Sequence, residues 1–399
     1  MNTRPPSSRL SHLAADLQPS GIREFFDLVV GMEDVISLGV GEPDFPTPWR
    51  ICDAVIDSLQ RGSTSYTSNH GLLELRVEIA RYLERRYGLQ YDPETQILVT
   101  VGVSEALDLV MRALLDPGDE VLVPDPCYVS YAPCVTLAHG RPVFVPTGIE
   151  DEFKLRPQAL SAAITGDTKA LLMGYPNNPT GAVMTRDELA ALSDVAVAND
   201  LIVISDEIYA ELTYEGEHAS VPTLPGMYDR TILLNGFSKA HAMTGWRIGY
   251  ACGPEEIIEA MVRVHAYVAL CAPIVAQTGA IEALRNGDGD CARMVAEYDQ
   301  RRRVFVNGLN RIGLSCFKPR GAFYAFPSIE VTGLSSAQFS RALLTDQKVA
   351  AVPGSAFGER GEGHIRCTYA SSIADLREAL ARMERFLSRL VAGETQVPE

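Results

Sequence analysis

The stretch GFSKAHAMTGWRIGY, residues 236–250, places Lys239 and Arg247 eight positions apart, with glycine and an aromatic residue between them. A lysine amine held away from water can act as a nucleophile or a base, and an arginine can bind a phosphate or a carboxylate. Strand-like runs at 232–234 and 248–251 lead into and out of the stretch, so we expect a loop between two buried strands. Either cation, taken alone, is more often a solvated loop charge.

One hydroxyl residue and one acidic residue also follow apolar runs of the kind that form buried strands. Ser104 follows the run 97–101 and opens an amphipathic stretch, where free backbone N–H groups and the helix dipole favour an anion such as phosphate. Asp206 follows the run 201–205, and a carboxylate at the buried end of a strand is costly unless it meets a cation. Ser104 alone is also explained as a helix N-cap, and Asp206 as a capping or turn residue.

A third polar residue, Asn178, lies in the turn YPNNPTG at 175–181, after the apolar run 169–173. Because Asn178 precedes a proline, we expect it to be extended, with its amide free to point into a site. Turns of this kind are common, so the turn alone does not indicate a site. In an open parallel sheet, however, ligands bind beyond the carboxyl ends of the strands, and we expect these side chains to meet there.

The elements that must position these residues alternate along the chain. Short β-branched runs, separated by amphipathic stretches such as 104–115 and 186–199, indicate a mostly parallel sheet covered by helices on both faces, and hence an α/β fold. After about residue 285 the pattern changes to an Arg-rich helix near 290–311, short strands, and a last helix with apolar residues three and four positions apart. This second pattern predicts a smaller α+β domain.

One cofactor accounts for all of the candidate residues at once. The matches are a pyridinium nitrogen for Asp206, a phenolic oxygen for Asn178 and Tyr209, a phosphate for Ser104 and Arg247, and an aldehyde for Lys239. These four groups occur together in pyridoxal 5′-phosphate. The sequence therefore predicts a pyridoxal-phosphate enzyme.

At near full length the chain resembles the fold-type I pyridoxal-phosphate aminotransferases of class I. The resemblance rests on LGVGEPDF at 38–45 and then, in order, on NNPTG, SDEIY, SKxxxMxGWRxG and Ile365-Arg366-Cys367. It implies a large domain with a seven-stranded sheet over residues 46–285, and a small α+β domain built from residues 1–45 and 286–399. It also implies a homodimer with active sites at the subunit interface.

The resemblance also assigns roles to single residues. Lys239 matches the lysine that binds the cofactor covalently and Asp206 the partner of the ring nitrogen, and with Tyr209 they form the expected catalytic set. The other expected cofactor contacts are Asn178 and Tyr209 to the ring oxygen, Tyr128 stacked on the ring, Ser104, Ser238, Arg247 and the Val103 N–H to the phosphate, and Tyr66 to the phosphate of the neighbouring subunit. Arg366 matches the arginine that binds the substrate α-carboxylate, with Gly39, Tyr128 and Asn178 beside it. An exposed strand arginine is the alternative for Arg366.

The implied activity is the transfer of an amino group between an L-amino acid and a 2-oxo acid by a ping-pong mechanism. We expect glutamate and 2-oxoglutarate as one pair, with aspartate or an aromatic amino acid as the other substrate. Specificity for the substrate side chain is expected to depend on the N-terminal segment near Arg23 and on the partner subunit. Arg23 is a candidate to bind an acidic substrate side chain, and a surface arginine is the alternative. The chain departs from the family at Gly236, where a hydroxyl residue is common, so one phosphate hydrogen bond is absent or replaced by water.

Two alternative functions stay open at this point. The first is a pyridoxal-phosphate-dependent carbon–sulfur β-lyase, which would release ammonia and pyruvate instead of exchanging an amino group. The second is a non-catalytic ligand-sensing module like the aminotransferase-like half of some transcription regulators. The short segment before Gly39 and the acidic net charge disfavour this second alternative.

Composition limits the partners. The chain has 51 acidic and 35 basic residues and a net charge of −16, which argues against sequence-independent binding of nucleic acid or of an anionic membrane. No apolar run approaches membrane-spanning length and the N-terminus lacks the apolar core of a secretory signal, so we expect a cytoplasmic protein. The eight cysteines form no C-x-x-C pair and the seven histidines show no metal-ligand spacing. We therefore expect reduced thiols and no metal site.

Overall fold

The computed structural model describes residues 10–17, 19, 21–22, 29 and 31–395. Its largest sheet has seven strands in the order β2-β8-β7-β6-β5-β3-β4. The strands are β2 (Ile97–Thr100), β3 (Glu120–Asp125), β4 (Arg141–Pro146), β5 (Thr168–Gly174), β6 (Ile202–Asp206), β7 (Thr231–Gly236) and β8 (Gly249–Cys252). β8 runs antiparallel to both of its neighbours, and the other pairings are parallel. The expected α/β class and the mostly parallel seven-stranded sheet are confirmed.

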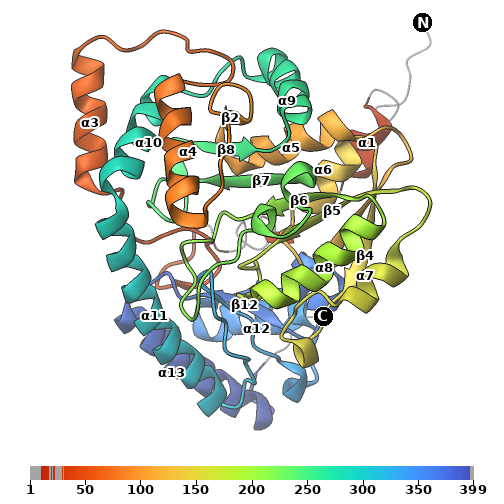
Figure 1. Cartoon of the computed structure of the whole chain (residues 1–399). Helices are drawn as coiled ribbons and strands as arrows, with labels where there is room; N and C mark the ends of the chain where they lie inside the picture. The colour runs from red at the N-terminus through yellow and green to blue at the C-terminus, as the bar shows by residue number, and fades with distance from the viewer. Residues whose placement is uncertain (1–9, 18, 20, 23–28, 30, 396–399) are drawn as a thin grey trace, which may run out of the picture.

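Helices cover both faces of this sheet (Figure 1). Neighbouring residues of a strand point to opposite faces. In β2, Leu98 belongs to the core shared with α5, α6 and α9, while Ile97 and Val99 belong to the core shared with α3, α4 and α10. On β5, Leu171 and Met173 belong to the core shared with α7 and α8. The helices are α3 (Trp49–Gln60), α4 (Leu73–Tyr87), α5 (Gly102–Leu114), α6 (Tyr131–Leu137), α7 (Pro157–Ala163), α8 (Arg186–Ala198), α9 (Glu255–Val268) and α10 (Ile274–Asn286). Burial on both faces explains why these strands are continuous apolar runs.

The C-terminal elements form a second core below the sheet in Figure 1, where α11 is drawn in teal and the later elements in blue. Its elements are α11 (Asp288–Arg311), β9 (Tyr324–Ala325), α12 (Ser336–Gln347), β11 (Val352–Pro353), β12 (Ile365–Thr368) and α13 (Ile373–Val391). The strands form a small antiparallel sheet in the order β11-β12-β9. On α13, Leu376, Leu380 and Met383 are buried in this core, as the apolar spacing of the last helix predicts.

The N-terminal segment joins the same core. After α1 (His12–Asp16), the short strand β1 (Ile36–Ser37) pairs in parallel with β10 (Val349–Ala350), and Leu38 is fully buried. The domain boundaries at 46 and 286 stay a prediction, and Arg23 lies outside the described residues. Among the helices of the described ranges, none is long and apolar enough to cross a membrane.

Candidate active site

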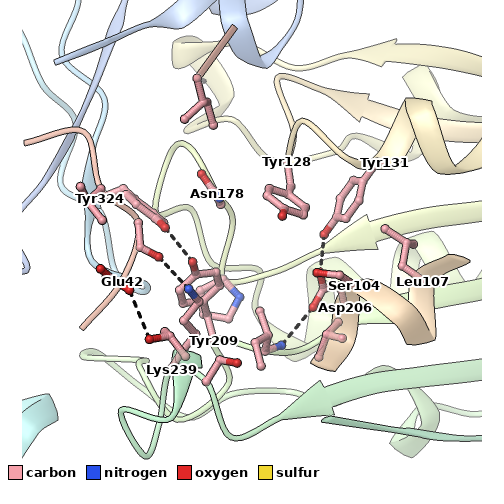
Figure 2. A pocket seen from close by; sticks show the side chains of 18 of the residues that line it. Glu42, Ser104, Leu107, Tyr128, Tyr131, Asn178, Asp206, Tyr209, Lys239 and Tyr324 are labelled. Atoms are coloured by element: carbon pink, nitrogen blue, oxygen red, sulfur yellow. Dashed lines mark hydrogen bonds between the residues drawn. The ribbon is translucent and has the colours of Figure 1, made fainter. Parts of the chain in front are cut away.

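A cavity of about 420 Å³ lies beyond the carboxyl ends of the parallel strands (Figure 2). Its wall gathers every predicted site residue except Gly39 and Tyr66, namely Val103, Ser104, Tyr128, Asn178, Asp206, Tyr209, Ser238, Lys239, Arg247 and Arg366. Lys239 and Arg247 lie on the connection between β7 and β8, as expected for a loop between buried strands. The position of the cavity follows from the parallel sheet, because strands that run the same way end at the same edge.

Lys239 is a partly buried amine in this cavity. Its Nζ donates a hydrogen bond to the carbonyl oxygen of Gly41 at 2.6 Å. Burial lowers the pKa of Lys239 to about 8, and the positive charges of Arg366 and Arg247 act in the same direction. A larger fraction of this amine is therefore uncharged near neutral pH than for an exposed lysine, which favours its action as a nucleophile or a base.

Asp206 is the last residue of β6 and is only 8% exposed. One carboxylate oxygen accepts the Ile208 N–H at 3.2 Å, and the other accepts the hydroxyl of Tyr131 at 2.9 Å. Burial raises the pKa of Asp206 to about 6, against the effect of these two hydrogen bonds. A carboxylate that is charged in so buried a place is stabilised by a cation, and a protonated ring nitrogen fits that requirement.

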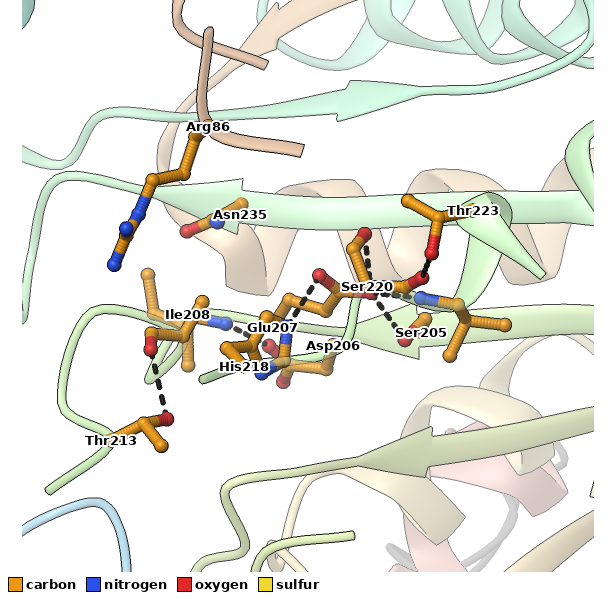
Figure 3. Close-up of polar contacts among 12 residues, drawn as sticks. Arg86, Ser205, Asp206, Glu207, Ile208, Thr213, His218, Ser220, Thr223 and Asn235 are labelled. Carbon is orange, nitrogen blue, oxygen red and sulfur yellow. Dashed lines mark hydrogen bonds and ion pairs between the residues drawn. The ribbon is translucent and has the colours of Figure 1, made fainter. Parts of the chain in front are cut away.

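Glu207, the next residue, anchors the end of β6 through partners outside the cavity (Figure 3). Its carboxylate accepts the hydroxyls of Ser205 and Ser220 at 3.0 and 3.1 Å and lies 2.7 Å from a ring nitrogen of His218. The Val221 N–H donates to it at 3.0 Å. Because each oxygen of this buried carboxylate has a partner, the network is satisfied and holds the strand end that carries Asp206.

The first turn of α5 and the side chain of Arg247 form a candidate anion site. The helix begins at Gly102 after Val101, so Ser104 lies inside the first turn and is not the N-cap, and the simpler explanation of Ser104 is wrong. A Cβ on Gly102 would lie 2.7 Å from the Arg247 guanidinium, which shows how closely that group approaches the turn. Free N–H groups of a first turn, a serine and an arginine together suit a phosphate.

Two residues that the sequence analysis did not identify hold this turn. Glu105 accepts the Val101 N–H at 2.6 Å, and its other oxygen lies 2.9 Å from a ring nitrogen of the fully buried His265 on α9. The glutamate thus fixes the backbone between β2 and α5, where Val103 and Ser104 lie. A carboxylate two or three residues after a glycine has no distinctive spacing, so no sequence signal pointed to this pair.

The structure gives a packing reason for Gly236. Gly236 faces Gly249 across the β7–β8 pair, and a Cβ on Gly236 would lie 2.9 Å from the Gly249 Cα and 3.0 Å from the Ile248 carbonyl oxygen. Side chains do not make such close contacts with backbone. A side chain at residue 236 would therefore require the backbone of β8 to shift, and the absence of a hydroxyl here accompanies this close approach.

Arg366 lies on β12 and is 2% exposed, so the alternative of an exposed strand arginine is wrong. Its Nη1 donates to the Asn178 side-chain oxygen at 3.0 Å and its Nη2 to the Gly39 carbonyl oxygen at 2.5 Å. Its Nε is buried and has no hydrogen-bond partner among the described residues. An unpartnered N–H on a buried guanidinium that lines a cavity leaves donor capacity for a carboxylate ligand.

Aromatic residues form another part of the wall. Tyr128 lines the cavity and packs edge-on against Tyr131, with ring centroids 5.6 Å apart. Tyr209 places its hydroxyl 2.7 Å from that of Tyr324. Tyr131 and Tyr324 were not predicted as site residues, although Tyr131 is only three residues after Tyr128, and its N–H donates to the Tyr128 carbonyl oxygen at 3.0 Å in the turn before α6. Tyr66, by contrast, is 83% exposed and outside the cavity.

The residues present fit pyridoxal 5′-phosphate. The wall offers a buried carboxylate for a cationic ring nitrogen, an amine of lowered pKa for an aldehyde, and an arginine beside a helix first turn for a phosphate. A second buried arginine remains for the carboxylate of a substrate. The four groups face one cavity, which is what a single ligand carrying all of these functions requires.

Comparison with known proteins identifies the family. The family described as aminotransferase class I and II matches residues 33–383. The chain is 53% identical to the putative aminotransferase YugH of Bacillus subtilis (96% of this chain, 99% of the relative) and 48% identical to an aspartate aminotransferase of Pyrococcus abyssi (93% and 96%). The crystal structure of an aromatic aminotransferase from Pyrococcus horikoshii superposes with a TM-score of 0.88 at 46% identity, over 92% of this chain and 99% of the other. The chain therefore belongs to the class I and II aminotransferases and is a pyridoxal-phosphate-dependent enzyme of class I.

Proposed function

We propose that this aminotransferase exchanges an amino group between an L-amino acid and a 2-oxo acid by a ping-pong mechanism, so that the first 2-oxo acid leaves before the second binds. Glutamate and 2-oxoglutarate form one pair, and aspartate or an aromatic amino acid is the other substrate. The observation that carries the proposal is that the Lys239 amine, the Asp206 carboxylate and the Arg366 guanidinium line one cavity. Those are the groups that proton transfer at Cα and binding of an α-carboxylate require.

Three residues of the chain have separate roles in the proposed reaction. When bound, the cofactor supplies a sink for the electron pair left at the substrate Cα. Asp206 keeps the ring nitrogen protonated, and Lys239 holds the cofactor covalently and then, as a free amine, moves the proton at Cα. Arg366 orients the substrate through its carboxylate, beside Gly39 and Asn178.

The remaining residues bind the cofactor without changing its bonds. Tyr209 and Asn178 donate to the ring oxygen, and Tyr128 covers one face of the ring. The phosphate is held by the side chains of Ser104, Ser238 and Arg247 and by the Val103 N–H. A phosphate at a helix first turn gains both hydrogen bonds and the favourable end of the helix dipole.

The wall of the cavity bears on the choice of amino acid. Its cations among the described residues are Lys239, Arg247 and Arg366, and each already has a role. A second carboxylate on the substrate therefore needs a cation from elsewhere, such as Arg23 or the second subunit. Ile22, Val40 and Leu107 add apolar wall, which favours an aromatic side chain unless Arg23 or the second subunit supplies that cation. Relatives named as aspartate and as aromatic aminotransferases both occur among similar proteins.

The assembly that we propose is a homodimer, located in the cytoplasm. The strongly exposed Tyr66 supports it, because an 83% exposed tyrosine outside its own cavity is free to reach another subunit. In this arrangement Tyr66 contacts the phosphate held by the second copy of the chain. The two-domain division, at residues 46 and 286, belongs to the same proposal.

A panel of amino acids tests the proposed function. Purified holoenzyme is mixed with one amino acid at a time, without a 2-oxo acid acceptor, and the absorption of the bound cofactor is recorded. We expect bleaching with glutamate and with aromatic or aspartate substrates, matched by one equivalent of the corresponding 2-oxo acid per site. Continuous release of ammonia and pyruvate would instead identify a β-lyase, and no response to any amino acid would contradict the proposal.

A further inference from the structure

Tyr324 connects two parts of the cavity that have separate proposed roles. It lies on β9, is 1% exposed, and places its hydroxyl 2.7 Å from the Tyr209 hydroxyl (Figure 2). Its ring lies against the Arg366 guanidinium, with 4.6 Å between the guanidinium carbon and the ring centroid. Phe357 packs on the same guanidinium at 4.7 Å. Tyr324 therefore contacts both the group proposed for the cofactor oxygen and the group proposed for the substrate.

The two hydroxyls constrain each other's protons. Burial raises the pKa of Tyr209 and of Tyr324, so both phenols are neutral around pH 7. A neutral phenol has one proton to donate and can accept at its oxygen. If Tyr209 donates to the cofactor oxygen, it has no proton left for Tyr324, and the 2.7 Å contact is a hydrogen bond only when Tyr324 donates.

We propose that Tyr324 is a positioning residue with two separable functions: its hydroxyl donates to Tyr209 and directs the Tyr209 proton to the cofactor oxygen, and its ring fixes the Arg366 guanidinium for the substrate carboxylate. The inference rests on the proposed function of Tyr209 and Arg366 and adds a residue to it. A hydroxyl whose oxygen accepts a hydrogen bond becomes a stronger donor through its own proton. By donating to Tyr209, the Tyr324 hydroxyl therefore strengthens the hydrogen bond from Tyr209 to the cofactor oxygen.

The space around the hydroxyl supports this assignment. A Cβ on Gly41 would lie 2.5 Å from the Tyr324 hydroxyl oxygen, so the N-terminal segment admits the phenol only because residue 41 is glycine. The carbonyl of the same glycine accepts the Lys239 amine at 2.6 Å. The Tyr324 hydroxyl thus lies between the backbone of Gly41 and the hydroxyl of Tyr209.

The first experiment removes the hydroxyl alone. Tyr324→Phe holoenzyme is titrated with pH while the absorption of the bound cofactor is followed. A weaker hydrogen bond to the cofactor oxygen disfavours its deprotonated form, so we expect the midpoint to rise by about 0.5 pH unit. Because the ring remains, KM for the amino acid stays within about twofold of the wild-type value. The control is Tyr369→Phe, since Tyr369 is fully buried nearby, bonds the Ala322 carbonyl oxygen at 3.2 Å and does not line the cavity.

The second experiment removes the ring. Tyr324→Leu leaves Arg366 stacked on one side only, and we expect KM to rise about tenfold for every amino acid and 2-oxo acid tested. An increase for one substrate only would contradict a role in holding the shared carboxylate. If Tyr324→Leu fails to fold, Tyr324→Phe still tests the hydroxyl through the spectrum, which a packing role would not shift.

The outcomes separate this inference from the function on which it rests. If wild-type enzyme forms the covalent cofactor adduct at Lys239 and the midpoint of Tyr324→Phe equals that of wild type and of Tyr369→Phe, the role of the Tyr324 hydroxyl is wrong while the proposed function stands. If wild-type enzyme forms no adduct at Lys239, the proposed function fails and this inference fails with it.

Discussion

The hydroxyl of Tyr131 donates a hydrogen bond to the Asp206 carboxylate at 2.9 Å, and it does so through space left by a glycine. Gly174, at the end of β5, is the register partner of Asp206 on β6. A Cβ on Gly174 would overlap with the Tyr131 hydroxyl oxygen. The first residue of α6 therefore reaches the end of β6 because the intervening strand ends in glycine.

Removal of this hydrogen bond changes the acid–base behaviour of the site. The bond from Tyr131 lowers the pKa of Asp206, so in Tyr131→Phe that pKa rises. We expect kcat to fall about tenfold and the acidic limb of the kcat/KM profile to move to higher pH, since a hydrogen bond to a charged group contributes about 1.5–3 kcal/mol. A pH–rate profile identical to that of wild type would show that Tyr131 does not tune Asp206.

Gly174→Ala tests the same relationship from the other side. The added methyl group displaces the Tyr131 hydroxyl, so the variant should reproduce the kinetic defect of Tyr131→Phe and also lose about 1–3 kcal/mol of unfolding free energy. The double variant should lose less activity than the product of the two single effects. Gly166→Ala is the control, because a Cβ there meets no atom within 4 Å, and its unfolding free energy should change by less than about 0.5 kcal/mol.

The sequence predicted the site from the residues that follow the expected strands. Asp206, Asn178 and Lys239 each follow an apolar run, and parallel strands bring such positions to one edge. What the sequence could not supply was contact between elements that are distant along the chain. Tyr324 meets Tyr209 across 115 positions, and neither the GAFYAF run nor its burial pattern distinguishes a wall residue from a core residue.

Close backbone packing and helix ends were also not visible in the sequence. At position 236 the chain has glycine where the family motif often has a hydroxyl residue. Only the packing against Gly249 shows why a side chain has little room there. Ser104 reads as an N-cap because serine is frequent there, yet the helix already begins at Gly102. Helix ends and close backbone contacts depend on tertiary structure, which local patterns do not encode.

Arg366→Lys should weaken substrate binding without preventing turnover. A lysine cannot offer two parallel N–H groups to a carboxylate or stack on two rings as a guanidinium does. We expect KM to rise about 10- to 100-fold for both the amino acid and the 2-oxo acid. Steady-state kinetics with both substrates test this, with the exposed Arg341→Lys on α12 as a control. An unchanged KM would remove Arg366 from the substrate site.

Asp206 should destabilise the apoenzyme in a pH-dependent way. Its folded-state pKa of about 6 lies above the unfolded value of 3.8, so the folded state is favoured when the carboxyl is protonated, and this stability is lost as pH rises through about 6. Without the cofactor, Asp206→Asn should therefore be more stable than wild type, and the difference should grow by about 1 kcal/mol between pH 5 and pH 8. Denaturant unfolding of the two apoproteins measures it, with the exposed Asp194→Asn as a control.

The same substitution should have the opposite effect on catalysis. In the holoenzyme Asp206→Asn removes the charge that stabilises the protonated ring nitrogen, and we expect kcat to fall about 10²- to 10³-fold. A gain in apoprotein stability together with a loss of turnover identifies Asp206 as a residue kept for function. Turnover at the wild-type rate would contradict its assigned role.

The covalent attachment of the cofactor at Lys239 is the most direct test of the whole account. The chain has five lysines, Lys154, Lys169, Lys239, Lys318 and Lys348, and of these only Lys239 lines the cavity. Holoenzyme is reduced with borohydride, digested and mapped by mass spectrometry. We predict one cofactor per chain, on the peptide that contains Lys239. A label on any of the other four lysines, or no label, would contradict the account.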